Sequence, residues 1–353
     1  MAFVAATALT GVAALVLAMW LGGNLTQSNI LGLAIGGTGS VTGWGLPATK
    51  LVMDLSSVGV IGMLLACLLL PGREPSDTTR RCLRTASVLA LAWGISNAAL
   101  LVFSWSDVVA RPVTDLPYSQ LFTDTARTFP DAAGFITSTA LALVIAGGLA
   151  VTETRRGVWL LLPLSIYNLV PMALQGHASH GTLLKYSIGL HVIAMSLWVG
   201  GLAALLMHVR SEPAQLAVTV PRFSIIALAC YSAVAATGII AAWQLLGSVS
   251  AIWGSQYGVV LMLKAAALVA LGTFGWWHRR HTVHHLRADE SGARARRAFV
   301  RLAAAEVAIM VAAVAIAVAL SRSASPDTIL LHTNRKTSAA AAVQPAVQPA
   351  VRR

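Results

Sequence analysis

Residues 183–207 read LLKYSIGLHVIAMSLWVGGLAALLM, and this run decides the fold class. Lys185 and His191 are its only ionisable side chains apart from a tyrosine. A helix rises about 1.5 Å per residue, so about 20 apolar residues cross the hydrocarbon core of a bilayer. We therefore predict that the run forms a transmembrane helix.

Eight further apolar runs of similar length occur along the chain. The nine runs lie at residues 2–21, 52–70, 85–104, 133–151, 157–174, 183–207, 223–247, 258–277 and 298–320. Only 11% of the residues are charged and 57% are hydrophobic, whereas a soluble domain carries about 25% charged residues. This composition excludes a soluble fold of this size and a disordered chain. We expect an all-α polytopic membrane protein with about nine transmembrane helices.

The basic residues are distributed unevenly among the loops, which predicts the orientation of the helices. With nine spans, the loops on one side carry fifteen arginines, and those on the other side carry four basic residues. Loops rich in Lys and Arg face the cytoplasm. We therefore expect a multi-pass protein of the cytoplasmic membrane, with its N-terminus cytoplasmic and its C-terminus extracytoplasmic. The arginines of these loops also explain the net charge of +12. We therefore expect no nucleic acid as a partner.

The runs divide the chain into three predicted parts. Residues 1–175 hold the first five helices, and residues 176–325 hold the last four. Residues 326–353 form a tail rich in Ala and Pro, which cannot bury a core and is expected to be disordered.

Candidate metal ligands gather around the sixth run. His177 and His180 lie in the predicted external loop before it, and His191 lies inside the helix. Met195 and Trp198 follow four and seven residues later, on the same helical face. Because imidazole and thioether together suit copper, Cu(I) above all, we expect the loop histidines to capture copper and His191 and Met195 to receive it. The alternative is that the loop histidines are merely solvated and that Met195 packs.

Three further ionisable residues lie within predicted spans: Asp54, Lys264 and Glu306. Placing an ionisable side chain in a bilayer costs free energy, and such residues are often functional. Together the three residues suggest a polar path across the bundle. In the alternative reading, Lys264 snorkels toward the interface and Asp54 caps the start of its helix. Glu306 has the least convenient route to water, which favours a functional role for it.

The cysteines and the enzyme motifs give mainly negative information. Cys67, Cys82 and Cys230 lie in three different segments without a CxxC, which implies neither a disulfide framework nor a thiolate zinc site. Cys82 and Cys230 are able to bind Cu(I), but we expect them to be inert packing residues. The sequence has no P-loop, GxSxG or HExxH, so we expect no enzymatic activity.

Several short motifs follow one another in the second half of the chain. They are Leu190-His191, Trp198–Gly201, Arg222–Ser224, Thr237-Gly238, Tyr257-Gly258 with Lys264, and Arg301 with Glu306. In order, spacing and helix placement, residues 176–325 resemble the copper resistance D (CopD) family. The resemblance implies a multi-helix membrane protein linked to copper uptake or transfer across the cytoplasmic membrane.

The first half is similar to the N-terminal part of actinobacterial proteins that fuse a CopD region to a cytochrome c oxidase assembly (CtaG-type) region. Trp44–Pro47, before the second run, and Gly176–Ala178 carry this similarity. No assembly half follows residue 325, so we expect a role in oxidase assembly only with a separate protein.

We expect copper transport or transfer, in copper import, homeostasis or resistance, with copper as the transported ion. The expected partners are copper, the bilayer, and a periplasmic copper-binding protein or an oxidase assembly factor. One alternative is a b-type haem redox protein, but His191 and His208 lie on one helix about 25 Å apart and cannot share a haem. Another alternative is a non-transporting copper scaffold for cytochrome c oxidase assembly.

The predicted orientation is testable with topology reporters. A reporter fused after Leu286 should read cytoplasmic, because seven arginines crowd that loop. A reporter fused after Asp124 should read extracytoplasmic. The reverse pattern would overturn the nine-span arrangement and the side on which copper is captured.

Overall fold

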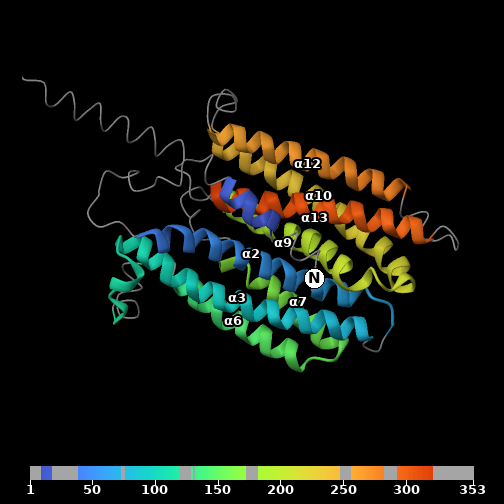
Figure 1. The fold of residues 1–353 in the computed structure, drawn as a ribbon, viewed down its shortest axis with the longest axis horizontal. Helices are drawn as coiled ribbons and strands as arrows, with labels where there is room; N and C mark the ends of the chain where they lie inside the picture. Colours follow the sequence, from blue (N-terminus) through green and yellow to red (C-terminus); the bar gives the residue numbers. More distant parts are fainter. Residues whose placement is uncertain are drawn as a thin grey trace, which may run out of the picture.

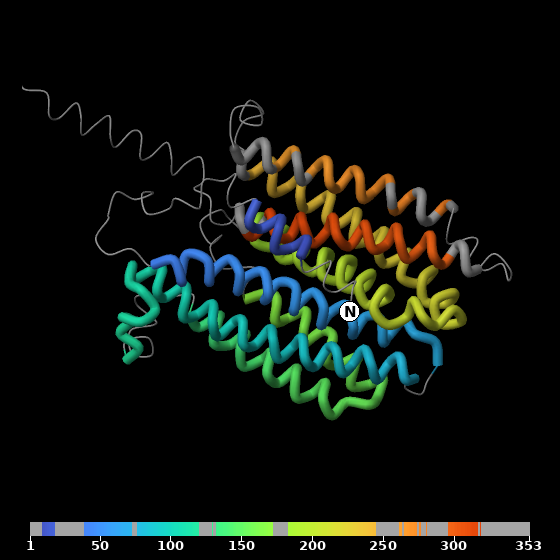
Figure 2. The backbone as a smooth tube through the Cα atoms, in the orientation of Figure 1, coloured from blue at the N-terminus to red at the C-terminus, as the bar shows by residue number. Residues whose placement is uncertain are grey.

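The computed structural model describes residues 9–17, 39–72, 76–119, 129, 132–171, 182–246, 256–281 and 292–320. Within these ranges the regular structure is helical, and the helices lie side by side in an elongated bundle (Figures 1 and 2). After a helical segment at 9–17, the elements are α2 (Gly39–Leu69), α3 (Asp77–Val109), η2 (Val113–Asp115), α6 (Ala132–Val151), α7 (Arg155–Tyr167), α9 (Thr182–Ala204), η3 (Leu205–Val209), α10 (Pro213–Leu246), α12 (Gln256–His281) and α13 (Gly292–Leu320).

Six helices of the described part are long and apolar enough to cross a membrane. They are α2, α3, α6, α9 with its continuation η3, α10 and α13. The prediction of an all-α membrane protein is confirmed. The count of nine spans and the sidedness of the termini stay predictions, although each predicted run from residue 52 onward overlaps one of the helices.

Helix α2 begins earlier than the sequence analysis expects. The apolar run was predicted to start at residue 52, but α2 starts at Gly39 and includes Trp44 and Pro47. A proline is tolerated in a membrane helix because neighbouring helices and local adjustments satisfy the backbone groups that it frees. Asp54 therefore lies well inside α2, so the alternative reading of it as a cap at the helix start is wrong, and its place in a polar path stays a prediction. It pairs instead with Lys50 one turn earlier, at 3.8 Å.

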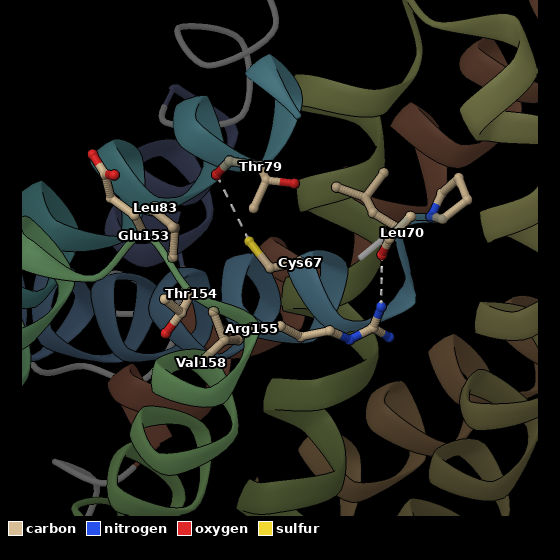
Figure 3. Close-up of a pocket in the computed structure, with 10 residues that line it drawn as sticks. Cys67, Leu70, Thr79, Leu83, Glu153, Thr154, Arg155 and Val158 are labelled. Atoms are coloured by element: carbon tan, nitrogen blue, oxygen red, sulfur yellow. Dashed lines mark hydrogen bonds between the residues drawn. The ribbon is translucent and has the colours of Figure 1, made fainter. Parts of the chain in front are cut away.

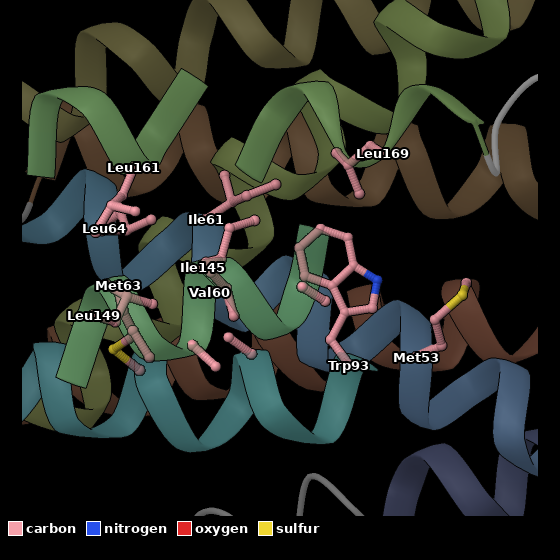
Figure 4. Packing of buried hydrophobic residues seen from close by; sticks show 14 of the residues in the cluster. Met53, Val60, Ile61, Met63, Leu64, Trp93, Ile145, Leu149, Leu161 and Leu169 are labelled. Atoms are coloured by element: carbon pink, nitrogen blue, oxygen red, sulfur yellow. The ribbon is translucent and has the colours of Figure 1, made fainter. Parts of the chain in front are cut away.

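Helix α2 connects two hydrophobic cores. On one side it packs against α3 and α7, and α6 completes a core that includes Ile61, Trp93 and Ile145 (Figure 4). On the other side it packs against α9, where a second core includes Trp198 and Met310 from α9 and α13. Figure 1 shows α2 between α3 and α9. The position of the first core relative to the second therefore depends on the contact of α2 with α9.

That contact is a direct approach of two backbones at Gly62 of α2 and Gly200 of α9. A Cβ atom at Gly62 would overlap the backbone of Gly200, and one at Gly200 would overlap the carbonyl oxygen of Val58. In lipid there is no hydrophobic driving force for helices to associate. Small residues that allow close packing therefore determine where membrane helices cross. Glycine is required at both positions because any side chain would force the helices apart.

Helix α10 lies on the outside of the bundle and presents large apolar side chains outward. Ile225, Ile239 and Trp243 are all exposed, and Trp243 retains 81% of its accessible surface. A soluble protein rarely exposes an apolar face of this length. In a bilayer the same side chains contact lipid, which agrees with the hydropathy of α10.

The structure brings three of the four arginine-rich loops to one end of the bundle. Arg155 at the start of α7 and Arg222 in α10 both donate to backbone carbonyls at the C-terminal end of α2. Arg81 of α3 pairs with Glu212, just before α10, at 3.4 Å. Arginines from these three loops thus lie at the same end of the bundle. We call this region the arginine-rich end.

Replacing Gly62 by Ala should destabilise the bundle, because the added Cβ has no space against the backbone of Gly200. Overpacking of this kind costs about 1–3 kcal/mol. Thermal unfolding of the purified protein in detergent measures the effect. Gly189→Ala is the matched control on α9, since a Cβ there meets nothing within 4 Å. Equal stability of Gly62→Ala and Gly189→Ala would contradict the close contact.

Candidate metal centre

His191 of α9 contacts the neighbouring helix α10 through a short chain of polar groups. Its Nδ1 lies 2.9 Å from Oγ1 of Thr237. One turn earlier on α9, the hydroxyl of Ser187 donates to the backbone carbonyl of Thr237 at 3.2 Å. Ser187 and Thr237 are buried and His191 is half-buried. Two side chains of α9 thus hold one residue of α10 and fix where His191 sits.

The hydrogen bonds of Thr237 determine the tautomer of His191. The hydroxyl of Thr237 has one proton, which it donates to the carbonyl of Ala233 at 2.6 Å. Its oxygen therefore accepts at the 2.9 Å contact, and Nδ1 of His191 carries the hydrogen. A neutral imidazole with its hydrogen on Nδ1 has its lone pair on Nε2. Metal-bound histidines are commonly held in this way, with the second ring nitrogen donating to a neighbouring group.

Met195 and Trp198 follow His191 along α9, as the helical spacing predicts. The buried ring of Trp198 packs edge-on against Tyr231 of α10, with 5.5 Å between the ring centroids. His191 and Trp198 therefore both face α10. Met195 lies between them in sequence, is half-buried and packs against the second core. The structure thus supports a shared face for the three residues.

Glu306 is buried in the middle of α13, with 6% of its surface exposed. Since α13 starts at Gly292, Glu306 is about 21 Å along the helix from its first residue. Its neighbours Ala303 and Val307 belong to the core against which Met195 packs. A carboxyl group at this depth requires a proton or a cation to compensate its charge.

The other predicted site residues are less informative. His177 and His180 lie outside the described residues, as does the side chain of Lys264, although its backbone is part of α12. Asp54 forms the ion pair with Lys50 described above, and its backbone carbonyl accepts from Ser57 at 2.9 Å. Of the predicted ligands and path residues, the structure thus characterises His191, Met195, Asp54 and Glu306.

In the described part of the chain, no three His, Cys, Asp or Glu side chains cluster as a metal site would require. Zinc and calcium sites need several such ligands. A site built from one imidazole and one thioether is soft and uncharged, which suits Cu(I) among the common biological metals. The arrangement around His191 is therefore compatible with copper and unsuited to hard ions.

Thr237 belongs to one of the short motifs that resemble the family, and the sequence alone predicts no role for it. Its hydrogen bond to His191 joins residues 46 positions apart on two helices. A hydroxyl on a lipid-spanning helix can donate to its own helix, as Thr237 does to Ala233, and still accept from a neighbouring helix. Which residue is the partner depends on how α9 and α10 align, and periodicity within one helix contains no such information.

Two family models match the chain. The one for the N-terminal domain of copper resistance protein D-like proteins matches residues 38–185, and the one for copper resistance protein D matches residues 217–320. Together they cover more than two thirds of the chain. The chain belongs to the copper resistance protein D family. No curated protein and no solved structure matches it.

Membership in the copper resistance protein D family gives the chain a copper-related function in a membrane. The matched regions run from α2 into the start of α9 and from α10 to α13. Residues 186–216, which include His191 and Met195, lie between them. The predicted division of the chain at residue 175 stays a prediction.

Changing Thr237 to Val should alter the tautomer of His191 without changing the volume of the side chain. The Nδ1 hydrogen then loses its acceptor, and an unsatisfied buried donor costs about 1–3 kcal/mol. Solid-state NMR of protein labelled with ¹⁵N-histidine, with His191 assigned by its loss in His191→Ala, reports the protonated nitrogen. Thr237→Ser should retain the Nδ1–H form. A wild-type protein with the hydrogen on Nε2 would contradict this assignment.

Proposed function

We propose that this chain transfers copper across the cytoplasmic membrane and that Cu(I) binds between α9 and α10 through Nε2 of His191 and the thioether of Met195. The carrying observation is the hydrogen bond from Nδ1 of His191 to Thr237, at 2.9 Å, in a member of a copper resistance family. In the neutral imidazole it places the hydrogen on Nδ1 and the lone pair on Nε2, which is the form that binds copper.

The ligand set suits passage better than storage. Neither imidazole nor thioether carries a charge, so the bound copper keeps its positive charge and is held less strongly than by thiolates. Transport requires binding that is favourable enough for the ion to arrive and weak enough for it to leave. Ser187 and Thr237 position the histidine, and Trp198 packed on Tyr231 closes the same helix pair one turn beyond Met195.

Glu306 provides the next polar group along the proposed path. It is buried in α13, beside residues of the core against which Met195 packs. A carboxylate in this environment attracts a cation strongly, because little water competes for it. We assign to Glu306 the role of compensating the charge of copper near the middle of the bundle.

In this proposal, His177 and His180 raise the local supply of copper on the extracytoplasmic side. Copper then moves from His191 and Met195 toward the arginine-rich end. The chain has no nucleotide-binding motif, so the driving force is the copper gradient, chelation inside the cell or the membrane potential. The potential contributes about 2.3 kcal/mol per charge per 100 mV.

A haem function is less compatible with the geometry. Haem held by two histidines needs them on facing helices. His208 lies in η3, at the arginine-rich end of the helix that carries His191, and its Nε2 lies 3.1 Å from Oγ1 of Thr85. We therefore prefer copper. The scaffold alternative, in which copper binds but does not cross, is distinguished by measuring transport.

Met195→Leu should strongly reduce copper accumulation in cells that express the protein. The substitution preserves volume and apolarity, so packing alone predicts a cost below about 1.5 kcal/mol and no loss of transport. Met207→Leu is the matched control, because Met207 is also half-buried and follows on η3. Copper content is measured at equal membrane levels of each protein, with His191→Ala as the companion variant.

The proposal requires that both Met195→Leu and His191→Ala lose accumulation while Met207→Leu keeps it. Wild-type accumulation in both variants would show that the cluster is ordinary membrane packing. The copper-related function would then rest on family membership alone.

A further inference from the structure

The buried carboxyl group of Glu306 has no counter-charge among the described residues. Its neighbours one turn away on α13, Ala303 and Met310, are fully buried in the second core, so Glu306 faces that core as well. Three ion pairs join described residues, and none of them includes Glu306. An unpaired carboxylate in this position is costly, which favours a bound proton while no cation is near.

The contacts of the helical segment at 9–17 show how deep Glu306 lies. A Cβ atom on Gly11 would be 3.1 Å from Cγ1 of Val311 and 3.9 Å from a methyl group of Leu51, so these two residues of α13 and α2 lie at one depth. Glu306 precedes Val311 by five residues, which places it about 7.5 Å closer to the arginine-rich end. It is therefore about level with Ser56 of α2.

Met195 lies at nearly the same depth as Glu306. Gly200 of α9 meets α2 at Gly62 and at the carbonyl of Val58, and Met195 precedes Gly200 by about 7.5 Å. Helices α2 and α9 run in the same direction (Figure 1), so Met195 is level with the same turn of α2 as Glu306. The two residues thus differ in depth by less than about one helical turn, on helices that pack against each other.

Several other titratable side chains surround Glu306, because α2, α9, η3 and α12 all pack against α13. Within the spans they are Lys50, Asp54 and Cys67 of α2, Lys185, Tyr186 and His191 of α9, His208 of η3, and Tyr257 and Lys264 of α12, with Arg296, Arg297 and Arg301 nearer the start of α13 itself. The side chains of Tyr257 and Lys264 lie outside the described residues. Asp54 differs from Glu306 in having a counter-charge, since it pairs with Lys50.

We propose that copper transfer is coupled to proton movement in the opposite direction, with Glu306 as the group that carries the proton. This inference rests on the proposed copper function. In the empty protein the carboxyl group of Glu306 holds a proton. When Cu(I) reaches His191 and Met195, the O–H bond breaks, the proton passes to water on the extracytoplasmic side, and the carboxylate compensates the charge of the ion.

The cycle closes when Cu(I) leaves toward the arginine-rich end and Glu306 takes a proton from the cytoplasmic side. One positive charge then moves inward for each one that moves outward, and no oxidation state changes. The exchange is electroneutral, so the membrane potential does no work on it. The copper gradient and chelation inside the cell remain as driving forces, and an acidic outside opposes the entry of copper.

The test uses sealed liposomes that contain the purified full-length chain, an enclosed Cu(I)-binding dye and an enclosed pH dye. Valinomycin with equal potassium on both sides holds the membrane potential at zero, so protons do not leave merely to balance charge. After Cu(I) is added outside, copper entry should be accompanied by a rise in internal pH. Acidifying the outside should slow the entry.

Copper entry without a rise in internal pH would overturn the coupling and leave the proposed function intact. A lack of copper entry, with copper still bound by the protein, would instead contradict the proposed function and the coupling with it. Both outcomes are decided on the wild-type chain, so neither depends on the folding of a variant.

Variants then test whether Glu306 carries the proton. Glu306→Gln keeps the volume but removes the exchangeable proton, so it should abolish the pH change and slow copper entry, whereas Glu306→Asp should restore both. Glu153→Gln is the matched control and should behave as wild type. Glu153 is exposed at the arginine-rich end, where it lines a small cavity with Arg155 (Figure 3). A wild-type pH change in Glu306→Gln would overturn the assignment of the proton to Glu306.

Discussion

The backbone contact between Gly62 of α2 and Gly200 of α9 is the constraint on which the rest of the structure depends. Helix α2 contributes to both hydrophobic cores, so its alignment with α9 determines how the two halves of the bundle meet. Because lipid is as apolar as the side chains, only close packing and polar contacts select one alignment among many. The glycine pair allows a close crossing at this point and so helps to position the residues of α9.

The polar chemistry follows from this placement. With α9 held against α2, its opposite face meets α10, and there His191 and Ser187 engage Thr237. The arginine-rich end is fixed by separate contacts, in which Arg155 donates to the carbonyl of Leu68 at the end of α2. The structure thus places the imidazole of His191 between two helices, α9 and α10. An imidazole and a thioether on one helix are soft ligands, which is consistent with the copper-related function of the family.

Run length alone predicted the helical membrane fold, because a bilayer admits few other structures. It failed at the start of α2, since Pro47 ends helices in water but is accommodated among packed helices. The shared face of His191 and Trp198 followed from periodicity within one helix, and it proved correct. The partner Thr237 did not follow, because it depends on the alignment between α9 and α10.

The most direct test of the central claim is copper flux through the isolated protein. Sealed liposomes containing the purified chain and an enclosed Cu(I)-binding dye are exposed to Cu(I) outside. The account predicts that the dye responds faster than in protein-free liposomes and that the rate saturates with external copper. A rate equal to that of protein-free liposomes, with copper still bound by the protein, would contradict transport and identify the chain as a scaffold.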